Sequence, residues 1–238
     1  MAPALKVAFK LGDGQVHAVT HGRESARPVM IHVHDDETTA VEAGRVHVAA
    51  HGGRLIRLAH SGQRLVSFRL GGREYAFDPN RMFSDAGIMT TLENHSTYSA
   101  AAHGEIKSLA TRFLERFTLD REPVIIALHN IVEGRFSVES FAGTGYLREA
   151  AAITHISPRR SKFDFFYVTT PAFYDYLAAR DFNVVLQDNA RAPDDGSLSI
   201  YFARKGIPYL NVEAEMRHLP EQIAMLKTVA EMLAGSSD

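Results

Sequence analysis

A histidine and a glutamate stand three residues apart, directly after an apolar stretch. His34 and Glu37 follow "PVMIHV", a run that is typical of a buried strand. At this spacing both side chains lie on one side of a first helical turn, so a single metal ion can contact both. Imidazole nitrogen and carboxylate oxygen both suit Zn²⁺, which in catalytic sites takes three protein ligands and leaves one position for water. His34 and Glu37 are therefore candidate zinc ligands.

Three residues close to this pair have other interpretations. His32 is on the same strand face as His34 and is an alternative ligand, although we favour a core or supporting histidine. Asp35 and Asp36 are expected to be first-turn acids whose charge suits the N-terminus of a helix. The helical zinc signatures H-E-x-x-H and H-x-x-E-H are both absent from the sequence.

Two further polar residues end apolar runs elsewhere in the chain. His129 follows "PVIIAL" and can complete a His₂Glu ligand set, and Glu213 ends the run "IPYLNVE". In open α/β sheets, ligands bind at the carboxyl ends of the strands. We therefore expect His129 and Glu213 to lie beside the H-x-x-E pair at one edge of a sheet.

Strand-like and helical stretches alternate along the chain. Strands are expected at 28–34, 54–59, 123–128, 163–170, 183–187 and 207–213, a hairpin at 64–77, and helices at 38–51, 96–117, 171–180, 201–206 and 220–233. Buried strands separated by helices predict an α/β fold, with a mixed, mainly parallel twisted sheet and helices on both faces. No repeat or long linker divides the chain, so residues 1–238 are expected to form a single catalytic domain.

Composition limits the classes of function. The 238 residues are 45% hydrophobic and 23% charged, which is typical of a globular protein. A formal net charge of −2 favours neither a nucleic-acid partner nor an anionic membrane. There are twelve histidines and no cysteine, so any transition-metal site must use histidine and carboxylate ligands.

The location of the protein is predicted only from the chain as it is written. No apolar run approaches the length of a membrane span, and no apolar segment follows Lys6 as it would in a signal peptide. We therefore expect a soluble protein without a membrane span. It would be cytoplasmic as written, and exported or periplasmic if a leader has been removed.

Four motifs follow one another in an order that is found in a known superfamily. They are His34-Asp35-Asp36-Glu37, Asp78-Pro79-Asn80-Arg81, Leu128-His129-Asn130 and Asn211-Val212-Glu213. In this order the chain resembles the zinc carboxypeptidase superfamily, including its aspartoacylase and succinylglutamate desuccinylase branch. The resemblance extends over roughly residues 28–232 and implies a zinc carboxypeptidase-like fold.

The resemblance also implies a role for each motif. It implies zinc binding by His34, Glu37 and His129, binding of a substrate carboxylate by Asn80 and Arg81, and a general base at Glu213. An arginine pairs bidentately with a carboxylate, and the neighbouring amide adds a donor. A positioned carboxylate takes the proton of the attacking water and returns it to the leaving amine. Glu215, two residues further on, is the alternative base.

The superfamily uses another arginine, ahead of the Asn-Arg pair, to polarise the scissile carbonyl. Arg73 stands seven residues before Asn80, and because this spacing matches the aspartoacylase-like branch, Arg73 is our choice. Arg64 and Arg69 stay open as alternatives, since their longer spacings match digestive-type carboxypeptidases.

Two features depart from the pattern of the superfamily. Digestive-type carboxypeptidases have a mobile tyrosine on the loop before the base strand, and the corresponding loop here, 187–199, contains none. Tyr201, Tyr174 and Tyr146 are the candidates to replace it. The stretch between the H-x-x-E and Asn-Arg pairs is short, so the substrate cleft is expected to be trimmed on that side.

The sequence as a whole predicts a zinc-dependent hydrolase that cleaves an amide bond next to a free carboxylate. A metallocarboxypeptidase acting on peptides, including the peptides of cell-wall peptidoglycan, is the first choice. An N-acyl amino acid deacylase of the aspartoacylase type is the alternative, as is a non-catalytic protein that binds carboxylate-ended peptides. The expected partner is a small peptide or an N-acyl amino acid, and the sequence predicts no oligomeric state.

Overall fold

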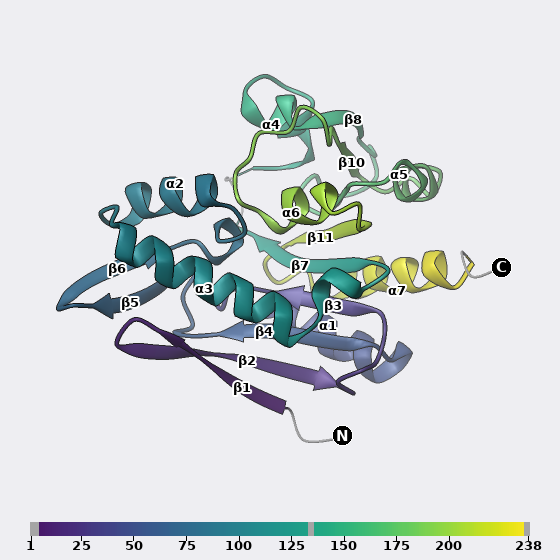
Figure 1. Ribbon diagram of the computed structural model, residues 1–238. Helices are drawn as coiled ribbons and strands as arrows, with labels where there is room; N and C mark the ends of the chain where they lie inside the picture. Colours follow the sequence, from purple (N-terminus) through teal and green to yellow (C-terminus); the bar gives the residue numbers. More distant parts are fainter. Residues whose placement is uncertain (1–4, 133–135, 236–238) are drawn as a thin grey trace.

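A nine-stranded mixed sheet forms the centre of the protein (Figure 1). The computed structural model describes residues 5–132 and 136–235. Within them the sheet strands are β1 (Leu5–Leu11), β2 (Gly14–Gly22), β3 (Val29–His32), β4 (Arg54–Ala59), β7 (Ile125–Ile131), β8 (Ala151–His155), β9 (Phe165–Val168), β10 (Val184–Gln187) and β11 (Tyr209–Glu215). Their order across the sheet is β1-β2-β4-β3-β7-β11-β9-β10-β8.

Four neighbouring strands at the centre of the sheet run parallel. These are β4, β3, β7 and β11, and every residue of β3 and β7 is buried. Such strands are apolar throughout because helices cover both of their faces. On either side the sheet continues with antiparallel pairs, β2 on β4 and β9 on β11, and β9 is parallel to β10. The prediction of a mixed α/β sheet is confirmed.

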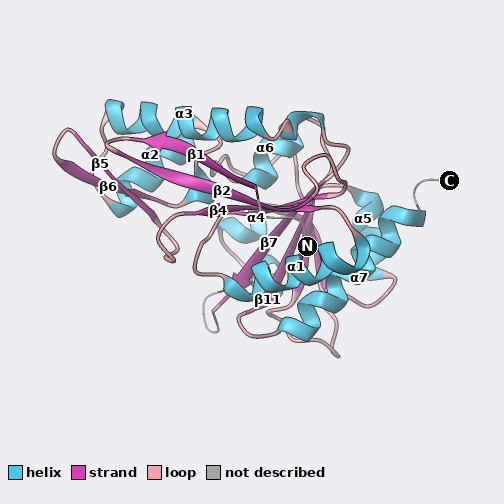
Figure 2. Ribbon diagram, turned by 90° about the horizontal axis from the view of Figure 1, so that it is seen from below, coloured by secondary structure: helices cyan, strands magenta, loops and turns pink. Residues whose placement is uncertain are grey.

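Helices cover both faces of the sheet. They are α1 (Thr38–His51), α2 (Asp85–His95), α3 (Ala100–Arg116), α4 (Tyr146–Glu149), α5 (Pro171–Ala178), α6 (Leu198–Arg204) and α7 (Leu219–Gly235). Figure 2 shows α3 on one side of the sheet and α1 and α7 on the other. Two large groups of buried apolar side chains, one on each side, join these helices to the sheet. None of the described helices is long and apolar enough to cross a membrane.

Most of the elements lie where the sequence predicts them. The helix at 38–51 and the strand at 54–59 coincide with α1 and β4, and the expected hairpin is formed by β5 (Val66–Leu70) and β6 (Arg73–Phe77). The helix predicted from residue 96 begins later, because the Ser99 side chain accepts a hydrogen bond from the Ala102 N–H and caps α3. The prediction misses the β1–β2 hairpin, α2 and β8.

A glycine lets α1 lie close to the sheet beneath the strand that carries His129. A Cβ atom on Gly44 would stand 2.7 Å from Leu128 Cδ1 and 3.0 Å from Leu55 Cδ2. Both leucines are fully buried, so neither has room to move away. The N-terminus of α1 follows Glu37, so the packing at Gly44 also helps to hold this glutamate in place.

We predict that Gly44→Val destabilises the protein by about 1–3 kcal/mol, the usual cost of overpacking a core. The matched control is Gly104→Val on α3, where nothing lies within 4 Å of the added Cβ. The control should change the free energy of unfolding by less than about 0.5 kcal/mol, as exposed substitutions usually do. Chemical denaturation measures both, and equal effects of the two changes would contradict the close packing of α1.

Candidate metal centre and active site

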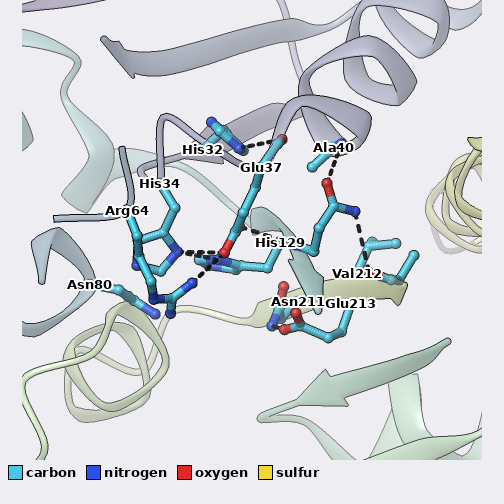
Figure 3. Close-up of polar contacts among 12 residues, drawn as sticks. His32, His34, Glu37, Ala40, Arg64, Asn80, His129, Asn211, Val212 and Glu213 are labelled. Carbon is cyan, nitrogen blue, oxygen red and sulfur yellow. Dashed lines mark hydrogen bonds and ion pairs between the residues drawn. The ribbon is translucent and has the colours of Figure 1, made fainter. Parts of the chain in front are cut away.

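The two histidines and the glutamate that the sequence suggests as ligands lie together. We call His34, Glu37 and His129 the His-Glu-His cluster; all three side chains are buried. His34 Nδ1 lies 3.0 Å from Glu37 Oε1 and 3.1 Å from His129 Nδ1, and His129 Nδ1 lies 3.1 Å from Glu37 Oε2. Figure 3 shows these side chains converging from the loop after β3, the start of α1 and the end of β7.

The donor atoms of this cluster fit a zinc ion. Two imidazoles and one carboxylate form the His₂Glu set of catalytic zinc sites. Zinc bonds of about 2.0–2.2 Å at tetrahedral angles separate neighbouring ligand atoms by about 3.3–3.5 Å. The contacts of 3.0–3.1 Å are only slightly shorter, so small side-chain movements make room for an ion.

Asp78 orients the first histidine of the cluster. Its Oδ1 lies 2.7 Å from His34 Nε2, so His34 Nδ1 is the ring nitrogen that could bind a metal ion. A carboxylate on the second ring nitrogen is a common partner of metal-binding histidines. Asp78 opens the "DPNR" motif, yet the sequence gives no sign of this contact. Its side chain also accepts a hydrogen bond from the Asn80 N–H.

Charges compensate one another inside the cluster in the metal-free protein. Burial opposes a charge on His34, but the carboxylates of Glu37 and Asp78 prevail and raise its pKa to about 9. Burial would raise the pKa of Glu37, but His34 and His129 hold it well below its usual value. At neutral pH the metal-free cluster therefore contains an imidazolium beside a carboxylate.

His32 does not belong to the cluster. Its Nε2 lies 3.1 Å from the backbone oxygen of Glu37, and burial lowers its pKa to about 3. It is therefore a neutral histidine that fixes the backbone at the start of α1, which agrees with our favoured interpretation.

The arginine at the cluster is Arg64 and not Arg73. Arg64 Nη1 lies 2.6 Å from Glu37 Oε1, and Nη2 lies 3.6 Å from Asp78 Oδ2. Arg73 is exposed at the start of β6, and Arg69 is exposed on β5, so neither reaches the cluster. The position of the side chains therefore favours the alternative, Arg64, over our choice, Arg73, because the later arginines belong to the β5–β6 hairpin.

Asp35 holds the loop that leads to Arg64. Its Oδ2 accepts hydrogen bonds from the His60 N–H (2.9 Å) and the Gly62 N–H (2.8 Å), and its Oδ1 accepts one from Arg57 Nε (2.9 Å). The expectation that Asp35 serves the helix dipole is therefore wrong. Asp36 instead lines the cavity beside the cluster.

Glu213 faces the cluster from the neighbouring strand. It pairs directly with His129 in the parallel register of β11 and β7, and it is only 5% exposed. Burial raises the pKa of Glu213, although Asn211 Nδ2 donates a hydrogen bond to its Oε2 at 2.8 Å. Glu215 does not line the cavity and instead contacts His218 Nε2 at 3.4 Å.

The Asn-Arg pair reaches the same cavity from a short turn, η1 (Pro79–Arg81). Asn80 Oδ1 accepts a hydrogen bond from the Leu198 N–H at 3.1 Å, and Arg81 Nη1 lies 3.2 Å from Asp195 Oδ2. Both side chains of this ion pair are about one third exposed. Arg81 is therefore accessible from the cavity, with an internal carboxylate beside it.

No family model and no curated protein matches the chain. Among solved structures, thrombin activatable fibrinolysis inhibitor, a carboxypeptidase, is similar to it with a TM-score of 0.50 and 11% identity, over 98% of this chain and 72% of that one. The protein has a zinc carboxypeptidase-like fold. At this identity the likeness concerns the fold alone.

Two other solved structures are similar to the chain with lower TM-scores. One is a protein described as a metallopeptidase from Shewanella baltica, with a TM-score of 0.49 and 12% identity over 97% of this chain and 85% of that one. The other is succinylglutamatedesuccinylase/aspartoacylase from Rhodobacter sphaeroides, with a TM-score of 0.46 and 15% identity over 98% and 65%.

The cavity beside the cluster has a volume of about 300 Å³. Part of its wall is apolar and comes from Ile131, Phe136, Phe141, Leu147 and Phe165. Of the candidate tyrosines, Tyr174 and Tyr201 do not line it, and the side chain of Tyr146 lies outside the described residues. The tyrosines that line it are Tyr167 and Tyr209, from β9 and β11.

We predict that the protein binds one Zn²⁺ and releases about one proton on binding at pH 7. His34, with a pKa of about 9, is protonated there and must lose its Nδ1 proton to bind the metal. Zinc affinity should therefore rise about tenfold per pH unit up to about pH 9. Calorimetry in buffers with different ionisation enthalpies measures the proton release.

Matched variants separate the cluster from other histidines. His129→Ala should abolish tight zinc binding, whereas His60→Ala, on the loop held by Asp35, should retain it. Zinc binding without proton release, or equal loss in both variants, would contradict the proposed ligand set.

Proposed function

We propose that the protein is a zinc-dependent hydrolase that cleaves an amide bond next to a free carboxylate, foremost as a metallocarboxypeptidase on peptides, cell-wall peptides included. The observation that carries this proposal is that one cavity is lined by the His-Glu-His cluster, by Glu213 and by the Asn80-Arg81 pair. Metal ligands, a base and a carboxylate-binding arginine are the groups that this reaction needs. The proposal takes residues 1–238 as one catalytic domain.

The cluster and Glu213 would have different roles at the scissile bond. The His-Glu-His cluster would hold zinc, which when bound acidifies water and polarises a carbonyl group. Glu213 takes the proton of the attacking water and delivers it to the nitrogen of the leaving amine. A base for this task is most effective when its pKa approaches the working pH, and burial raises the pKa of Glu213 in that direction.

Two arginines would bind the oxygens of the substrate. Arg64 lines the cavity, and its guanidinium has more N–H donors than its contacts with Glu37 and Asp78 use, so it can stabilise negative charge on the carbonyl oxygen. Arg81 pairs with the terminal carboxylate, and Asn80 adds an amide donor. In the ligand-free protein Asp195 forms an ion pair with Arg81, so it would compete with the substrate carboxylate for this guanidinium.

Deacylation of N-acyl amino acids is the second candidate. A cavity of about 300 Å³ lies at the lower end of the range for ligand pockets. It therefore suits a small substrate as well as the last residues of a peptide. Both reactions break an amide bond beside a free carboxylate and use the same residues.

We predict that Glu213→Gln lowers kcat by at least about 10²–10⁴-fold and leaves zinc bound. Glutamine keeps the size and the hydrogen bonding of the side chain but cannot accept the proton. The measurement combines turnover of a panel of peptides and N-acyl amino acids with metal analysis.

Glu215→Gln is the matched control, because this residue lies two positions along the same strand and outside the cavity. It should stay active. If Glu213→Gln stayed active and Glu215→Gln lost activity, the assignment of Glu213 as the base would be wrong. An inactive wild type that binds zinc and the substrates would indicate a binding protein.

We predict opposite effects of two changes at the carboxylate site. Arg81→Ala should raise the KM for free-acid substrates at least about tenfold, because a charge pair with the substrate is lost. Asp195→Asn should lower that KM by up to about fivefold, as expected from removing a partly exposed ion pair of about 1 kcal/mol. Steady-state kinetics on free-acid and amidated substrates measures both.

The control for the second change is Asp194→Asn. Asp194 pairs with Arg204 at 2.6 Å, and no contact joins it to Arg81 among the described residues. This variant should keep the wild-type KM. If either Arg81→Ala or Asp195→Asn changed the KM for free-acid and for amidated substrates equally, Arg81 would not be the residue that binds the carboxylate.

A further inference from the structure

Two side-chain amides are buried behind the cluster. Asn130, at the end of β7, is 4% exposed, and Gln222, on α7, is 0% exposed. Gln222 Oε1 accepts a hydrogen bond from Asn130 Nδ2 at 3.0 Å. We call this pair the amide bridge, because it joins the sheet to α7 across the buried side of the site.

The amide bridge binds the backbone on both sides of Glu213. Gln222 Nε2 donates to the carbonyl oxygen of Val212 at 3.3 Å, and Asn130 Nδ2 donates to that of Ala214 at 3.3 Å. The peptide group that precedes Glu213 and the one that follows Ala214 are therefore both held by side chains. The pairing of β11 with β9 ends at Glu213, which pairs with Phe165, so β7 alone pairs with the next residue, Ala214.

The two residues of the bridge also contact the metal ligands, Gln222 through its side chain and Asn130 through its backbone. Gln222 Nε2 also donates to the carbonyl oxygen of His129 at 2.9 Å, and the Asn130 N–H donates to Glu37 Oε2 at 3.0 Å. The bridge is therefore in direct contact with a histidine and the glutamate of the cluster, as well as with the strand of the base.

Asn130 caps α1 in place of Glu37, which stands at the N-cap position. Glu37 is the N-cap residue of α1, yet its side chain caps no helix N–H group. Asn130 Oδ1 accepts the hydrogen bond of the Ala40 N–H at 2.7 Å instead, a contact drawn in Figure 3. Capping from β7 leaves the Glu37 carboxylate for the cluster.

Packing alone does not explain Gln222. Its neighbours on the buried face of α7 are Met225, Leu226 and Val229, and a buried amide is favourable only when its hydrogen bonds are made. Both amides of the bridge have partners for their oxygen and their nitrogen. A fully hydrogen-bonded buried network of this kind makes the surrounding structure rigid.

We propose that Asn130 and Gln222 are positioning residues that hold the base, Glu213, in register with His129 and Glu37. This proposal rests on the proposed function of Glu213. Misplacement of a catalytic group by about 1 Å can lower the rate about 10²-fold. The distance between the base and the metal ligands must therefore be held constant.

The experiment replaces Gln222 by methionine, which keeps the length of the side chain and removes its three amide hydrogen bonds. Gln222→Met should lower kcat about 10- to 100-fold, with KM and zinc affinity changed less than about threefold. Hydrogen exchange should become faster at the end of β11. Val229→Ala is the matched control, because it weakens the packing of the same buried face without touching a strand carbonyl, and it should keep kcat.

If Gln222→Met does not fold, Asn130→Asp is measured in its place, since it keeps the acceptor for the Ala40 N–H and loses the donor to Ala214. Unchanged kcat in the variant that folds, or an equal loss in Val229→Ala, overturns the proposal. If the wild type with bound zinc hydrolyses no substrate, the proposed function fails. Hydrogen exchange at β11 then decides whether the bridge holds this strand end, and unchanged exchange overturns it.

Discussion

The buried carboxylate of Glu37 is the interaction on which the site depends. Its Oε1 contacts His34 Nδ1 and Arg64 Nη1, and its Oε2 contacts His129 Nδ1 and the Asn130 N–H. A buried charge without partners costs several kcal/mol, so these donors must come together whenever the protein folds. The donors belong to separate segments of the chain. The need to pair the Glu37 carboxylate with all of them therefore restricts how these segments are arranged.

The central strands bring these residues together because they are parallel. Adjacent parallel strands end at the same edge, so β3 and β7 deliver His34 and His129 to one place, and β11 adds Glu213 directly beside His129. The loop that carries Arg64 follows β4, which is parallel to β3 and therefore ends at the same edge. Asp35, next in the chain to His34, accepts hydrogen bonds from the backbone N–H groups of His60 and Gly62 and holds that loop in place.

The parts of this site that could be predicted from sequence are those with a local signal. His34, His129 and Glu213 each end an apolar run, and such runs reveal buried strands and their ends. Arg64 could not be chosen over Arg73 because spacing along the chain does not show that β5 and β6 project away from the site. The amide bridge gives no local signal at all, since Gln222 is one polar residue on an otherwise apolar helix face.

Charge balance also bears on whether this site needs its metal in order to fold. In a zinc finger the ligands lack other partners, so metal binding supplies the folding energy. Here Arg64 and protonated His34 already neutralise the carboxylates of Glu37 and Asp78. If zinc binds as proposed, its two positive charges would replace the single proton of His34, so the local charge would rise by only one unit. The site is charge-balanced without a metal ion, so binding would exchange a proton for a metal ion in a site that is already formed.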